Sequence, residues 1–79
     1  MDDKIRSILK EHGQFPVDVA RIGDDEDLFT AGMTSHAIVS IMLALEDEFD
    51  LEFPESMLRK STFESVAAIR AAMIELHGS

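Results

Sequence analysis

Apolar side chains recur every three or four residues along most of the chain, which is the spacing of helices that bury one face. β-branched residues do not gather into alternating runs, and the sequence contains only 2 prolines. The pattern predicts an all-α fold of four helices, with a long loop between the first two and a short third helix. Residues 1–79 are expected to form a single domain.

The first helix is predicted over residues 2–12, where Ile5, Ile8 and Leu9 form an apolar stripe. Gly13 is a natural residue to end it. A long connection follows over residues 13–33, and a loop of this length in so small a domain is often functional. Six apolar side chains of this loop are expected to turn back into the core: Phe15, Val17, Ile22, Leu28, Phe29 and Met33.

The second helix is predicted over residues 35–49. On a helical projection, five of its apolar side chains share one wide face, which should be its main contribution to the core. These are Ile38, Ile41, Met42, Leu45 and Phe49. A polar break that ends at Pro54 follows, and it should carry Leu51 and Phe53 inward.

The third helix is expected to be a short turn over residues 55–59. The last helix is predicted to begin near Ser61 or Thr62, because Ser61 and Glu64 have the spacing of a capping box. Its inward side chains should be Phe63, Val66, Ile69 and Met73.

Charge and composition narrow the function. The chain has 16 acidic and 7 basic side chains, a formal net charge of −9, so nucleic acid is disfavoured as a partner and basic docking surfaces are favoured. Acidity that merely keeps a small domain soluble would explain the same balance. There is no cysteine, which excludes a disulfide framework, a thiol nucleophile and a thiolate metal site.

The size and hydropathy of the chain favour a function at the surface. A domain of this length buries only about 60% of its unfolded surface, which leaves little room for a catalytic cleft. The sequence begins without an apolar leader and has no stretch near the roughly 20 apolar residues that span a bilayer. We therefore expect a soluble, cytoplasmic protein, a monomer, without membrane contact.

A serine at the start of the second predicted helix is the main candidate for chemistry. Thr34 is a good N-cap residue, which places Ser35 in the first turn, where backbone N–H groups lack helical partners. An anion attached to Ser35 would be stabilised there. Taken alone, Ser35 is better explained as a residue that helps to cap the helix, because serine is common at helix starts.

Two longer motifs change that balance. Gly32-x-x-Ser35 opens the helix, and an acidic-aromatic stretch, Leu45-Glu-Asp-Glu-Phe-Asp-Leu-Glu-Phe-Pro54, follows. Together with the segment Ser61–Val66, they resemble the acyl carrier protein family over nearly the whole chain. The resemblance implies an acyl-carrier-like four-helix bundle. It also implies that Ser35 receives 4′-phosphopantetheine from coenzyme A, and that the arm's thiol carries an acyl or aminoacyl group as a thioester.

The resemblance also implies partners rather than catalysis. A phosphopantetheinyl transferase would attach the arm, an acyl- or amino acid-activating ligase would load it, and a downstream acyl-accepting enzyme would take the cargo. The segment Gly32–Ala37 is similar to stand-alone carriers that accept small amino acids from ligases resembling class II aminoacyl-tRNA synthetases. The alternatives are a fatty acyl, polyketide or peptidyl carrier, or a carrier-like interaction module without a prosthetic group.

Residues beside the serine depart from the family pattern, which usually reads Asp-Ser-Leu. Thr34 keeps the capping oxygen but removes a negative charge, and His36 replaces an apolar contact with an imidazole. Both positions, together with Val39 and Leu43 at i+4 and i+8 from Ser35, are predicted to dock partner enzymes. The alternative for Val39 and Leu43 is packing under the short third helix.

Metal and dyad chemistry are not expected. Residues 24–27 are four consecutive acids, but they lack the alternating ligands and the glycine of a calcium loop, so a solvated loop is the better interpretation. His12, His36 and His77 have no shared spacing. Ser35 and His36 are neighbours on a helix, about 100° apart, and no third group is evident to orient the imidazole.

Overall fold

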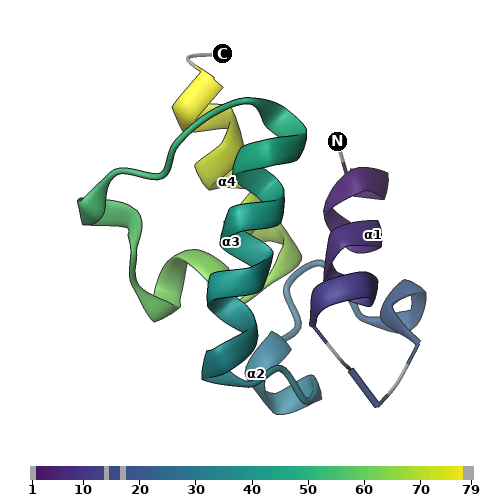
Figure 1. Cartoon of the computed structure of the whole chain (residues 1–79). Helices are drawn as coiled ribbons and strands as arrows, with labels where there is room; N and C mark the ends of the chain where they lie inside the picture. The colour runs from purple at the N-terminus through teal and green to yellow at the C-terminus, as the bar shows by residue number, and fades with distance from the viewer. Residues whose placement is uncertain (1, 14, 17, 78–79) are drawn as a thin grey trace.

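The computed structural model describes residues 2–13, 15–16 and 18–77, and every regular element in that part of the chain is helical. α3 runs through the middle of the molecule, with α1 beside it and the short α2 at its N-terminal end (Figure 1). α1 packs against both α3 and α4. The α-helices are α1 (Asp2–His12), α2 (Leu28–Ala31), α3 (Ser35–Phe49) and α4 (Val66–His77), and the 3₁₀ helices are η1 (Val19–Arg21), η2 (Glu55–Met57) and η3 (Lys60–Phe63).

The core forms where α1, α3 and α4 meet, and it confirms most of the predicted inward side chains. Among the residues that the structure describes, nine large side chains are fully buried: Ile5, Leu9, Leu28, Ile41, Leu45, Phe63, Val66, Ile69 and Met73. On α3 the fully buried face is narrower than predicted, because Ile38, Met42 and Phe49 pack only partly buried against the core. Ala37 is buried as well, which was not predicted.

No helix in the described part of the chain is long and apolar enough to cross a membrane.

The long connection contains two short helices, which the sequence pattern did not predict. η1 and α2 are each about one turn long, too short to produce a periodic pattern. Ile22, Leu28 and Met33 are buried as predicted, and Phe15 and Phe29 pack partly buried against the core. The predicted inward placement of Val17 lies outside the described residues.

The prediction for the start of the last helix was wrong. Residues 60–63 form η3, and α4 begins at Val66. The cap is Ser65, whose Oγ accepts the Ala68 N–H at 3.0 Å. The main chain just before α4 is also hydrogen-bonded to the start of α2, because the Glu64 carbonyl accepts the Leu28 N–H at 2.8 Å. The short turn predicted over residues 55–59 is present as the 3₁₀ helix η2, and the second 3₁₀ helix, η3, follows it.

Asp24, in the loop between α1 and α3, ties that loop to both α1 and α4. Its carboxylate accepts hydrogen bonds from Arg6 at 2.7 Å and from Arg70 at 3.3 Å, and its carbonyl accepts the Ala67 N–H at 2.9 Å. Arg6 also donates to the carbonyls of Val19 and Ile22, each at 2.8 Å. The acidic run is thus exposed, as expected of a solvated loop, but its first residue is also a structural anchor.

We expect the hydrogen bonds of Asp24 to make the folded state less stable as the pH falls into the acid range. Hydrogen bonds from Arg6, and then from Arg70, lower the pKa of Asp24 below its ordinary value of 3.8. A carboxyl whose pKa is lowered by folding stabilises the folded state fully above the unfolded pKa, and that contribution is lost as pH falls through the folded pKa. The melting temperature of the wild type should therefore exceed that of Asp24→Asn at neutral pH, and the difference should shrink below pH 3.8.

Circular dichroism melts over a pH series test this expectation. Asp25→Asn removes the same charge one residue away, from a side chain that makes neither arginine contact, and should leave the melting temperature nearly unchanged. Equal effects of the two substitutions, or a difference that persists in strong acid, would contradict the assigned role of Asp24.

Candidate functional site

The backbone in front of Ser35 is set by α2 and by Gly32. Asp27 caps α2, with its carboxylate accepting the Phe29 N–H at 3.0 Å. The helix ends at Gly32, whose φ of 127° favours glycine, and an added Cβ there would lie 2.5 Å from Cδ of Pro16. Both constraints explain why the Gly-x-x-Ser spacing begins with glycine.

Thr34 and Ser35 adopt the arrangement that the sequence predicts. Thr34 is the N-cap of α3, and its Oγ1 accepts the Ala37 N–H at 3.2 Å. Ser35 is the first residue of the 15-residue helix, and it is exposed. Ser35 lies at the positive end of the helix dipole, so a phosphodiester on the serine would be electrostatically favoured by about 0.3–1 kcal/mol.

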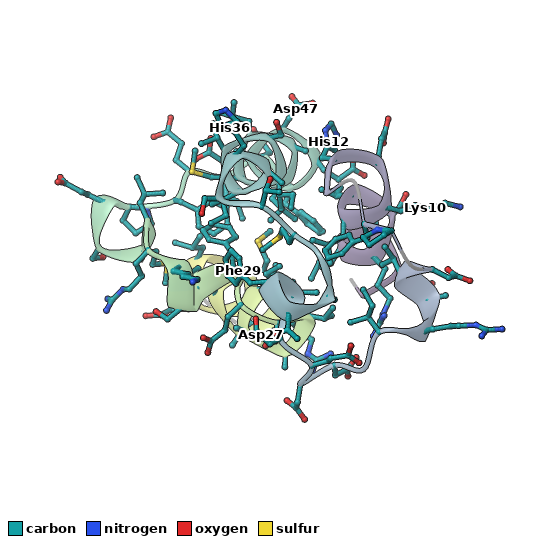
Figure 2. The ribbon with its side chains drawn as sticks, turned by 90° about the horizontal axis from the view of Figure 1, so that it is seen from below. Lys10, His12, Asp27, Phe29, His36 and Asp47 are labelled. Carbon is teal, nitrogen blue, oxygen red and sulfur yellow. The ribbon has the colours of Figure 1, made fainter. Side chains whose placement is uncertain are left out.

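The imidazoles near the site come from two helices. His36 is exposed on α3, and His12 lies at the end of α1, both on the upper side of the view in Figure 2. Together with Thr34 and Ser40 they line a hollow of about 510 Å³ between the two helices. The sequence pattern did not predict that His12 lines the same hollow as Thr34 and His36.

In the described part of the chain, the site shows neither a cluster of metal-ligating side chains nor an aligned Ser–His pair. Within residues 2–13, 15–16 and 18–77, no three His, Cys, Asp or Glu side chains are placed to hold a metal ion. The side chain of His77 lies outside what the structure describes. Ser35 and His36 are consecutive on α3 and diverge by about 100°, so the imidazole is not aligned as a base for the serine.

The predicted docking residues lie on the exposed side of α3. Val39 and Leu43 each have an exposed fraction of 55%, and they follow Ser35 at one and two turns along the same face. Val39 also borders the η2–η3 segment, but it is not buried beneath it. The exposure is compatible with docking, which stays a prediction for Thr34, His36, Val39 and Leu43.

The sequence pattern did not predict which residues lie opposite Val39 on this side of α3. Leu58, Arg59 and Lys60 follow η2 and face α3 across a hollow of about 260 Å³. Leu58 is 49% exposed, and Val39 across the hollow is 55% exposed. The apolar pair Met57 and Leu58 between polar residues was the available signal, although the sequence could not show which element Leu58 faces.

Comparison with known proteins gives a consistent result. The family model described as the phosphopantetheine attachment site matches residues 3–69 of the chain. An aminoacyl carrier protein of Agrobacterium fabrum is 45% identical over 69 residues, which cover 87% of this chain and 83% of that protein.

Solved structures agree in fold. The carrier protein of Agrobacterium tumefaciens, in a complex with AMP and an engineered glycine:[carrier protein] ligase from Bradyrhizobium japonicum, superposes with a TM-score of 0.89. It is 43% identical, and the match covers 91% of this chain and 96% of that one. A glycylated carrier protein bound to the Bradyrhizobium japonicum ligase is 27% identical, with a TM-score of 0.76 and coverage of 90% and 95%.

Proposed function

Because this chain belongs to the family of proteins with a phosphopantetheine attachment site, we propose that it is an aminoacyl carrier protein whose arm is attached to Ser35. The observation that carries the assignment of Ser35 is its place in the structure. It is an exposed hydroxyl at the first residue of a long helix, directly after an N-cap that holds the helix end in position.

The residues around Ser35 fit a phosphopantetheine group. When bound, the group supplies a flexible arm that ends in a thiol able to carry an amino acid as a thioester. The Ser35 hydroxyl would supply the oxygen of the phosphodiester, at the positive N-terminal end of α3, where an anion is stabilised. Thr34 keeps the first turn formed through its bond to the Ala37 N–H.

The cargo is proposed to be an amino acid rather than a fatty acyl, polyketide or peptidyl chain. The 45% identical relative is an aminoacyl carrier protein, and two similar solved structures are carriers bound to a glycine:[carrier protein] ligase. By analogy, a phosphopantetheinyl transferase would attach the arm, an amino acid:carrier protein ligase would load it, and a downstream enzyme would accept the cargo.

We propose no catalytic activity for the chain itself. Ser35 and His36 are not aligned as a nucleophile and base, and the chain has no cysteine. The reactive thiol would therefore come with the arm, and the activating chemistry would come from the partner enzymes.

The loading reaction tests the assignment. The holo protein, prepared with a broad-specificity phosphopantetheinyl transferase, is incubated with ATP, a glycine:[carrier protein] ligase and single small amino acids. We expect one aminoacyl group per protein by intact mass, released by hydroxylamine as expected for a thioester. The unmodified protein is the control and should gain no mass. Loading by fatty acyl donors alone would contradict the aminoacyl assignment.

A further inference from the structure

The hollow between α3 and the η2–η3 segment has an apolar floor and a basic rim. Its floor is made by Ile38, Val39, Met42, Leu58 and Phe63, and the two remaining lining residues are Arg59 and Lys60. With a volume of about 260 Å³, it has room for one or two apolar side chains. No acidic side chain appears in its described lining.

Both cations are held in place by the protein. The Arg59 Nε donates to the Ser56 carbonyl at 2.9 Å. The Lys60 ammonium lies 4.6 Å from the centre of the Phe29 ring, which sits between α2 and the η3 segment in Figure 2. Side chains that are already ordered lose less entropy when a partner binds them.

This rim differs in sign from the molecule as a whole. The net charge of the chain is −9, yet α3 carries no acid before Glu46. The hollow begins with Ile38 and Val39, three and four residues after Ser35, so it lies about one helical turn from the attachment serine. On this side of Ser35, the charged residues that line the hollow are therefore both cations.

We propose that this hollow docks the amino acid-activating ligase through an apolar side chain of the ligase flanked by carboxylates. Charge complementarity carries the choice of occupant, because Arg59 and Lys60 attract carboxylates and repel a basic surface. The inference rests on the proposed function, because it takes the loading ligase as the partner.

Charge reversal at the rim tests the proposal in the loading reaction. For holo Lys60→Glu and holo Arg59→Glu, the KM for the carrier should rise about tenfold, with kcat little changed, because only docking is weakened. Arg59→Glu keeps the Lys60–Phe29 contact, so it separates docking from any disturbance of α2. Lys10→Glu makes the same charge change on α1, outside the lining of this hollow, and should stay within about twofold of the wild type.

The outcomes distinguish this proposal from the proposed function. Intact mass first establishes that each variant is holo, and circular dichroism that each is folded. If the wild-type holo protein is not charged by any such ligase, both proposals fail. If it is charged and the rim variants have a normal or lowered KM, or match Lys10→Glu, only the docking proposal is overturned. A normal KM with altered thioester hydrolysis would place the loaded arm in the hollow, and would overturn it as well.

Discussion

Replacing Ser35 by alanine is expected to abolish attachment of phosphopantetheine completely. The phosphodiester needs a hydroxyl oxygen, and no neighbouring side chain takes the same place at the start of α3. Thr34 precedes the helix, and its hydroxyl is engaged with the Ala37 N–H. Coexpression with a broad-specificity transferase, followed by intact-mass measurement, should show one added phosphopantetheine on the wild type and none on Ser35→Ala.

The matched control for this experiment is Ser40→Ala. Ser40 is also an exposed serine on α3, but it lies in the second turn of the helix rather than at its start. Its replacement should leave modification complete, and Ser35→Ala should keep the wild-type circular dichroism spectrum. A wild type that stays unmodified with several transferases would favour the alternative of an interaction module without a prosthetic group.

Replacing Leu45 by alanine is expected to destabilise the fold by about 2–5 kcal/mol, because it leaves a cavity in the core. The Leu45 side chain is fully buried at the centre of α3. For a domain of this size, such a loss is a large part of a total stability of about 5–15 kcal/mol. Urea unfolding followed by circular dichroism measures the difference.

Leu43→Ala removes the same atoms two residues away on the same helix. Leu43 is 55% exposed, so its replacement should change the free energy of unfolding by no more than about 0.5 kcal/mol. Similar losses for the two variants would mean that the face of α3 turned toward the core is assigned wrongly.

The long helices were predictable because their patterns are local and extended. α1 and α3 have the predicted bounds, and the inward side chains of α4 were identified correctly. The start of α4 was not, because residues 61–65 offer two serines with capping chemistry. The Glu64 carbonyl bonds to the Leu28 N–H, and a contact between such distant segments leaves no periodic signal in the sequence.

The same division applies to the site. The position of Ser35 after the Thr34 cap depends only on adjacent residues, so the sequence predicted it. The basic rim was missed because Arg59 and Lys60 reach α3 only after the chain has folded back on itself. His12 approaches the site for the same kind of reason, from the far end of α1.

The hydrogen bonds that fasten the loop to the later part of the chain also set an order of events during synthesis. The loop in front of Ser35 is tied at Asp24 to Ala67 and Arg70, and at Leu28 to Glu64. A ribosome makes Ser35 well before these partners, because translation proceeds from the N-terminus. The serine is therefore in its finished setting only once residues 64–70 have emerged, so a transferase that recognises the folded site acts only after this later part of the chain has been made.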